Sequence, residues 1–163
     1  MKDELRAQLD GIFDARDAVE RRHAEVKAAA ETKRQKNARE FMNLRESVIR
    51  KAMETCGQYL QQRGYGFEIS TDDAKVDSRG VSSDASITLN FFKGRRTLEL
   101  HKYPHLKVIS KPDNGEVVFH MNTIGPVGGG QSGMCGTYPM SALNEELVQE
   151  RFVHVIRAMS SLG

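Results

Sequence analysis

Residues 87–121, ITLNFFKGRRTLELHKYPHLKVISKPDNGEVVFHM, carry the pattern that decides the fold. Apolar side chains alternate with polar ones along this stretch, as they do in strands that bury one face. Turns are expected at 93–95, 103–105 and 112–115, and the last combines a proline that fixes φ with a glycine that accepts positive φ. The pattern predicts an antiparallel meander of four strands, or five if residues 67–70 add another, with one face made by Ile87, Leu89, Phe91, Leu98, Leu100, Leu106, Val108, Val117, Phe119 and Met121.

A long helix is predicted to precede this meander. Its apolar residues recur at alternating spacings of four and three, which is a heptad pattern with polar interruptions. No proline occurs before Pro104, and only Gly11 interrupts the helical composition early on. The pattern indicates a coiled-coil seam, defined here as Leu5, Leu9, Ile12, Arg16, Val19, His23, Val26 and Ala30.

The apolar stripe becomes broader from residue 41 onward, as expected of a helix that packs on a sheet. Gly64 is the expected helix end, with Gly57 as an earlier alternative. A single helix over residues 3–63 would be about 90 Å long, which no small domain can bury. Either the helix folds back near residues 32–37, or its first half pairs with another chain. The stripe consists of Phe41, Leu44, Val48, Ala52, Cys56, Tyr59 and Leu60.

A second helix is predicted at the end of the chain, after a glycine-rich stretch. Residues 125–139, GPVGGGQSGMCGTYP, are expected to lack regular structure. Asn144 is then a suitable N-cap, and residues 147–159 carry an apolar face. These elements predict a two-layer α+β fold with an exposed helical segment at 1–36 for coiled-coil dimerisation and a sheet domain at 37–163.

Charge is distributed unevenly, although the formal net charge of +2 does not by itself indicate a nucleic-acid or membrane partner. Residues 33–51 hold seven basic and two acidic residues. Such a segment can track a phosphate backbone, which would make this protein a nucleic-acid or anion binder. However, the apolar stripe shares this segment and must face a core, which favours a solvated basic face made by Lys33, Arg34, Lys36 and Arg39.

The remaining sequence features point to a reducing compartment. Cys56 and Cys135 fit neither a disulfide framework nor a zinc site. The N-terminus has no apolar run typical of a signal peptide, and no stretch approaches the roughly 20 apolar residues that span a bilayer. We therefore expect a cytoplasmic protein without a membrane partner.

The glycine-rich stretch is a candidate binding loop, because consecutive amides without side chains can wrap an anion. It lacks the lysine and hydroxyl residue that end a P-loop. A mobile connector is the simpler interpretation, and a ligand-contacting loop is the alternative. The residues concerned are Gly128, Gly129, Gly130, Gln131 and Ser132.

Histidines and a thiol supply the other candidates. The alternating pattern places His101 and His120 together on the polar face of the sheet. Cys135 would be a natural nucleophile if His101, His120 or His154 came within hydrogen-bond reach. The sequence does not establish such proximity, so we assign no catalytic residue, cofactor or metal ligand.

The sequence thus favours a non-catalytic interaction or adaptor protein. It is expected to form a homodimer through its N-terminal helix and to present the sheet domain to a protein partner. The two alternatives are a nucleic-acid or anion binder that uses residues 33–51, and an enzyme of unknown reaction that uses Cys135 and a nearby histidine.

Overall fold

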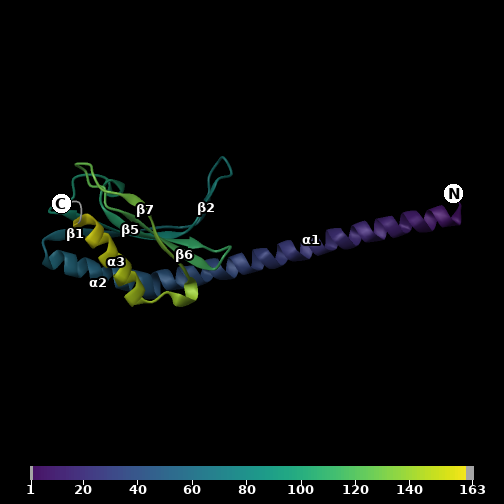
Figure 1. Ribbon diagram of the computed structural model, residues 1–163, viewed down its shortest axis with the longest axis horizontal. Coiled ribbons are helices and arrows are strands. Elements are labelled where there is room, and N and C mark those ends of the chain that lie inside the picture. Colours follow the sequence, from purple (N-terminus) through teal and green to yellow (C-terminus); the bar gives the residue numbers. More distant parts are fainter. Residues whose placement is uncertain (1, 161–163) are drawn as a thin grey trace.

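The computed structural model describes residues 2–160 and confirms the α+β class (Figure 1). A long N-terminal helix leads into an antiparallel sheet, and a C-terminal helix follows it. The elements are α1 (Asp3–Leu44), the π-helical turn η1 (Arg45–Ile49), α2 (Arg50–Gln62), β1 (Tyr65–Asp72), β2 (Lys75–Val76), β3 (Ser82–Ser83), β4 (Ser86–Lys93), the 3-10 turn η2 (Leu100–Lys102), β5 (His105–Lys111), β6 (Glu116–Asn122), β7 (Ser132–Pro139), the 3-10 turn η3 (Met140–Ala142) and α3 (Glu145–Ser160).

The main sheet has five antiparallel strands in the order β1-β4-β5-β6-β7. Each strand therefore pairs with its neighbour along the chain, apart from the short β2-β3 hairpin inserted between β1 and β4. Leu89 lies opposite Ile69 on one side and Leu106 on the other, so the apolar residues of successive strands share one face. The pairing of β6 with β7 is interrupted by a bulge between Phe119 and His120.

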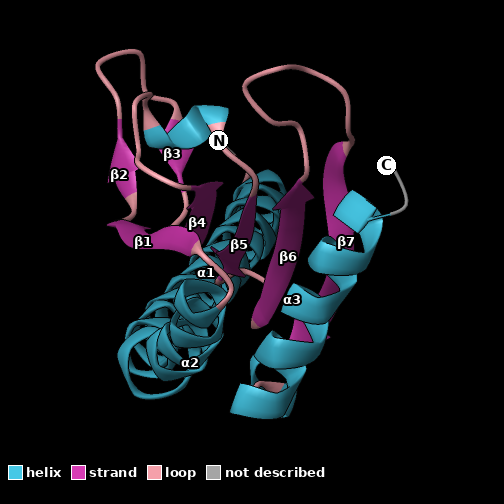
Figure 2. Cartoon of the chain, turned by 90° about the vertical axis from the view of Figure 1, so that its left-hand side faces the viewer, coloured by secondary structure: helices cyan, strands magenta, loops and turns pink. Residues whose placement is uncertain are grey.

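Helices α2 and α3 cover that apolar face (Figure 2). Phe152 of α3 meets Phe91 of β4 edge to face, with ring centroids 5.9 Å apart. The opposite face carries mainly polar side chains, including the two histidines of β5 and β6. The largest fully buried side chains are Phe41, Ile49, Met53, Ile87, Leu89, Phe91, Leu106, Val108, Val117, Phe119, Val148 and Val155.

The N-terminal helix does not fold back near residues 32–37. α1, η1 and α2 run on continuously, and the first half projects away from the sheet domain (Figure 1). Every residue from 3 to 33 is exposed, and we call this part the free segment. Contact with the sheet domain starts at Arg34, which pairs with Asp113 at 2.6 Å, and at Asn37, which donates a hydrogen bond to the Pro112 carbonyl at 2.8 Å.

The helix buries part of the predicted stripe, namely Phe41, Ala52, Cys56 and Leu60, and replaces the rest. Arg45 and Ile49 are buried, whereas their neighbours Leu44 and Val48 are only half-buried. Tyr59, predicted to lie in the core, is 53% exposed. The reason is the π-helical turn η1, whose wider i→i+5 turn moves residues spaced by four onto one face.

The strand predicted at residues 98–100 is wrong, and residues 125–139, predicted to lack regular structure, do so only as far as residue 131. Residues 98–100 belong to a loop that the Tyr103 hydroxyl anchors, because it accepts hydrogen bonds from the amides of Thr97 and Leu98, both at 2.9 Å. Conversely, β7 occupies most of the glycine-rich stretch. Its ladder with β6 outweighs the low strand propensity of glycine, and only residues 123–131 form a loop.

Three of the predicted helix ends and turns are confirmed, whereas the turn predicted at 103–105 is replaced by η2 and the start of β5. Gly64 follows α2 with φ at 82°, and Gly115 ends the 112–115 turn with φ at 65°. The Asn144 side chain caps α3 by accepting a hydrogen bond from the Leu147 amide at 2.8 Å.

Candidate functional site

The free segment presents an unpaired row of apolar side chains. Val26 is 70% exposed and Ile12 is 63% exposed, although both belong to the seam. Leu5, Leu9 and Val19 are 42–53% exposed, and Phe13 beside the seam is 56% exposed. No described helix is long and apolar enough to cross a bilayer.

The polar interruptions of the seam stay in water as well. Arg16 pairs with Glu20 one turn later at 3.3 Å, which leaves its charge on the surface of its own helix. His23 is exposed. A partner helix laid along the seam would therefore meet two apolar stretches that are separated by Arg16 and His23.

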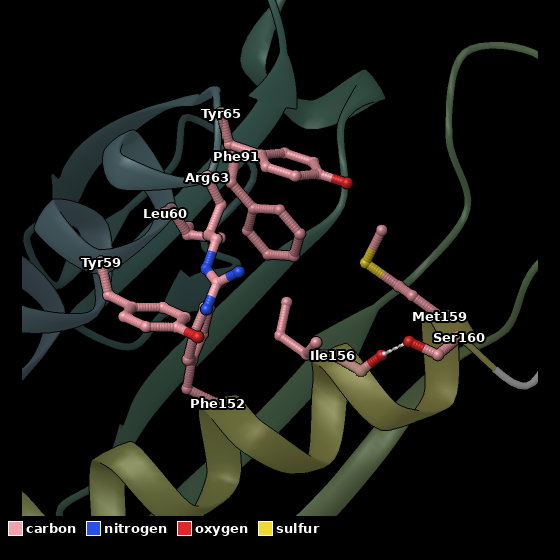
Figure 3. Close-up of a pocket in the computed structure, with 9 residues that line it drawn as sticks. All are labelled: Tyr59, Leu60, Arg63, Tyr65, Phe91, Phe152, Ile156, Met159 and Ser160. Atoms are coloured by element: carbon pink, nitrogen blue, oxygen red, sulfur yellow. Dashed lines mark hydrogen bonds between the residues drawn. The ribbon is translucent and has the colours of Figure 1, made fainter.

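A second surface lies at the far end of the sheet domain, where α2 ends, β1 begins and α3 ends (Figure 3). Two adjoining hollows of about 530 and 420 Å³ share Tyr65, Phe91 and Met159, and together they form what we call the aromatic groove. Six of the eleven aromatic residues in the chain line it: Tyr59, Tyr65, Phe91, Phe92, Tyr103 and Phe152.

The charged residues of the aromatic groove are all basic. Arg63, Lys93 and Arg95 line it, and no described acidic residue does. Among residues 2–160 none of the three cations has an acidic partner within 4.0 Å. The Arg63 guanidinium instead lies over the Tyr59 ring, 5.4 Å from its centroid, while Met159 lies across the groove on α3 (Figure 3). The groove therefore suits a ligand that combines apolar and acidic groups.

Sequence reasoning missed this groove. Tyr59 was assigned to the apolar stripe of the helix, and Arg63 only precedes the expected helix end at Gly64. Their spacing of four residues was the only local signal, because the other walls come from β1, β4 and α3, which only the tertiary fold brings together.

The candidate binding loop forms the connection between β6 and β7. Gly128, Gly129 and Gly130 all have positive φ, at 83°, 76° and 103°. The loop is closed at its base, where the Thr123 amide donates to the Gln131 carbonyl at 2.8 Å and the Gln131 amide donates to the Thr123 hydroxyl at 2.9 Å. The three glycines are therefore needed for the backbone conformation of the loop itself.

The structure brings only some of the predicted polar residues together. Ser132 pairs with Asn122 on β6, two residues from His120, so both candidates lie on the uncovered face of the sheet. His101 lies apart from them in η2, exposed and 3.5 Å from Glu99. The neighbour of His120 is instead His105, with ring centroids 6.5 Å apart.

His105 is held in a defined orientation. Its Nδ1 lies 2.9 Å from the Tyr103 carbonyl oxygen and donates a hydrogen bond to it, which leaves Nε2 unprotonated in the neutral ring. Burial lowers the pKa of His105, and the nearby His120 and Lys107 lower it further. Within residues 2–160 no group of three or more His, Cys, Asp or Glu residues is arranged to hold a metal ion.

The two thiols, Cys56 buried and Cys135 half-buried, lie away from these histidines. Cys135 packs against the core on the helix-covered face, whereas His105 and His120 lie on the opposite face. Burial raises the pKa of the Cys135 thiol, and it raises the pKa of Cys56 to about 11. A nucleophilic thiol needs the opposite shift, so the geometry gives no support to a site built on Cys135.

Part of the basic segment is already paired. Arg34 is bound to Asp113, the side chain of buried Arg45 reaches Asp73 at 2.9 Å, and Arg50 pairs with Glu46 at 2.6 Å. Lys33, Lys36 and Arg39 are exposed on α1, without an ion pair among the described residues. These three cations flank the base of the free segment.

Comparison of the chain with protein-family models, with curated proteins and with solved structures found no match. The seam of the free segment and the aromatic groove are therefore the two surfaces of the molecule that bear on its function.

Proposed function

We propose that the protein is a non-catalytic interaction protein that self-associates through the seam of its free segment and presents its sheet domain to a protein partner. One observation carries this proposal. The large apolar residues of the seam are 42–70% exposed, and every residue of the free segment is exposed, so none packs into the sheet domain. Burial of such a side chain contributes about 1.5–3 kcal/mol, and a second helix with the same seam provides that burial.

The free segment has a further need for a partner. Most helix stability in proteins comes from packing of an apolar face, and a helix without such packing is marginal in water. The free segment has 31 residues and therefore extends about 46 Å from the sheet domain, at about 1.5 Å per residue. None of these residues packs on the sheet domain. Pairing of two free segments would stabilise both.

The aromatic groove supports the second half of the proposal. It lies at the opposite end of the molecule from the free segment, so self-association through the seam leaves it open (Figure 1). Its aromatic walls and its unpaired cations fit an acidic, apolar segment of a partner protein, since aromatic and arginine side chains are common in protein interfaces.

The experiment compares two charge-matched double variants of the full chain. Ile12→Glu with Val19→Glu places carboxylates in the seam, whereas Ala7→Glu with Ala28→Glu places them on the outer side of the same helix. Ile12 and Val19 are 63% and 53% exposed in the single chain, so burial of these four side chains per dimer contributes roughly 3–7 kcal/mol, and the seam variant should dissociate at least about 10²-fold more readily. Sedimentation velocity should show a monomer for the seam variant and a dimer for the outer variant. Equal behaviour of the two variants would refute the proposal.

A further inference from the structure

We infer that two free segments pair in antiparallel orientation, with residues whose numbers add up to 35 facing one another. This inference rests on the proposed self-association and specifies its geometry. It also gives the exposed basic residues at the base of the free segment a role that the sequence left open.

The first argument comes from the polar residues of the seam. In heptad terms Leu9, Arg16, His23 and Ala30 occupy one class of core position, and Leu5, Ile12, Val19 and Val26 occupy the other. A parallel dimer pairs each class with itself, so Arg16 would face the partner's Arg16. Like charges in a half-buried layer repel, and each Arg16 has only Glu20 of its own helix to offset that repulsion.

An antiparallel dimer pairs the two classes with each other. Each polar residue then faces an apolar one. The aliphatic part of Arg16 can pack on the apolar residue that it faces, while its guanidinium stays in water beside Glu20. The remaining layers become wholly apolar. The four layers, each present twice by symmetry, are Leu5 with the partner's Ala30, Leu9 with the partner's Val26, Ile12 with the partner's His23, and Arg16 with the partner's Val19.

The second argument is the charge gradient along the free segment. Residues 3–17 hold five acidic and two basic residues, whereas residues 18–33 hold three acidic and four basic residues. Parallel pairing would place the two acidic halves together. Antiparallel pairing places each acidic half against the basic half of the partner, which is the electrostatically favoured arrangement.

The length of the overlap between the two helices matches the length of the free segment. In this register residue 3 lies opposite residue 32 of the partner, so the overlap uses the whole free segment. The overlap ends just before Arg34, where α1 first contacts the sheet domain through Asp113. The N-terminal end of one chain, which carries Asp3 and Glu4, then lies level with Lys33 of the other. Lys33 is exposed and has no ion pair among the described residues of its own chain.

The two orientations predict different overall shapes. Parallel pairing keeps both sheet domains at one end of a particle about 90 Å long, the length of α1 to α2. Antiparallel pairing about the midpoint of residues 17 and 18 puts the sheet domains at opposite ends, with the far ends of the two α2 helices about 130 Å apart. The aromatic grooves would then lie at the two tips of the particle.

The test uses disulfide formation in the full chain. Leu9→Cys and Val26→Cys are introduced together into a Cys56→Ala, Cys135→Ala background, and each is also introduced alone as a control. Oxidation of the double variant should give a covalent dimer whose tryptic linkage joins the peptide of residues 7–16 to that of residues 23–27. The single variants should form no disulfide, because the two copies of residue 9 would be about 25 Å apart.

Each outcome has a defined meaning. Linkage of residue 9 to residue 9, or efficient dimerisation of either single variant, would overturn the antiparallel inference, as would a dimer without a 9–26 linkage. A background protein that sediments as a monomer would instead refute the proposed self-association. Small-angle scattering of the unmodified chain gives an independent reading, with a maximum dimension near 130 Å expected and one near 90 Å contradictory.

Discussion

Gly11→Ala should tighten self-association without touching the seam. Gly11 is helical, exposed and two positions past Leu9, and a methyl group added there would meet no atom within 4 Å. In a helix interior glycine is less favourable than alanine by about 0.8–1 kcal/mol. The substitution therefore changes helix stability alone.

The size of the effect follows from the position of Gly11 in the free segment. The end of an unpacked helix frays in the monomer and is ordered in the dimer, so the gained helix stability appears in the dimer dissociation constant. Two chains contribute up to about 2 kcal/mol, which corresponds to a dissociation constant up to about 30-fold lower.

The assay is sedimentation equilibrium over a range of concentrations, with Ala7→Gly as the matched control. Ala7 is exposed on the outer side of the helix, so Ala7→Gly should raise the dissociation constant by a similar factor. The double variant should return to the value of the unmodified chain. A dissociation constant that Gly11→Ala leaves unchanged or raises would refute the reasoning that dimer formation orders this helix.

Three further predictions concern the sheet domain. Arg45→Leu should lower the free energy of unfolding by about 1.5–3 kcal/mol in urea denaturation, because it removes the hydrogen bonds to the Asp72 carbonyl and the Asp73 carboxylate. An unchanged free energy of unfolding would show that the π-helical turn is stable without these hydrogen bonds. Because burial lowers the pKa of His105, the unfolded chain binds more protons than the folded chain, and the free energy of unfolding should fall as the pH drops below about 6.5. His105→Gln should flatten this pH dependence. A pH profile that the substitution leaves unaltered would contradict this account. Combined alanine substitution of Arg63, Lys93 and Arg95 should make the aromatic groove bind the anionic dye anilinonaphthalene sulfonate about fivefold less tightly. Binding of the neutral dye phenylnaphthylamine should be unaffected. Equal losses of affinity for both dyes would refute a charge preference.

Local signals made the helix ends and turns predictable. Gly64 supplies the positive φ at a helix end, Asn144 supplies an N-cap acceptor, and Gly115 closes its turn, and each acts through its own backbone or its immediate neighbours. The alternation in β5 and β6 was equally local, because residues of these strands are alternately buried and half-buried, whereas β4 is buried on both faces.

Tertiary contacts decided what the sequence did not reveal. Strand β7 forms from a glycine-rich stretch only because β6 offers a ladder, and the π-helical turn at Arg45 appears because the helix must keep one stripe on the sheet. The proximity of the His120 and His105 rings depends on strand register, and His105 had been placed in a turn. The aromatic groove is assembled from several elements, so no short stretch contained it.

The prediction of an exposed seam needed both kinds of evidence. The spacing of Leu5, Leu9 and Ile12 indicated a coiled coil, yet the same spacing would suit a helix folded back on its own domain. The continuous helix from α1 to α2 leaves that seam uncovered within the chain. Self-association remains a prediction that the single chain motivates.

The molar mass of the full chain in solution tests this account most directly. Sedimentation equilibrium at micromolar concentration and moderate salt should give twice the 18.3 kDa mass of one chain. A mass of 18.3 kDa that persists as the concentration is raised would contradict self-association through the free segment.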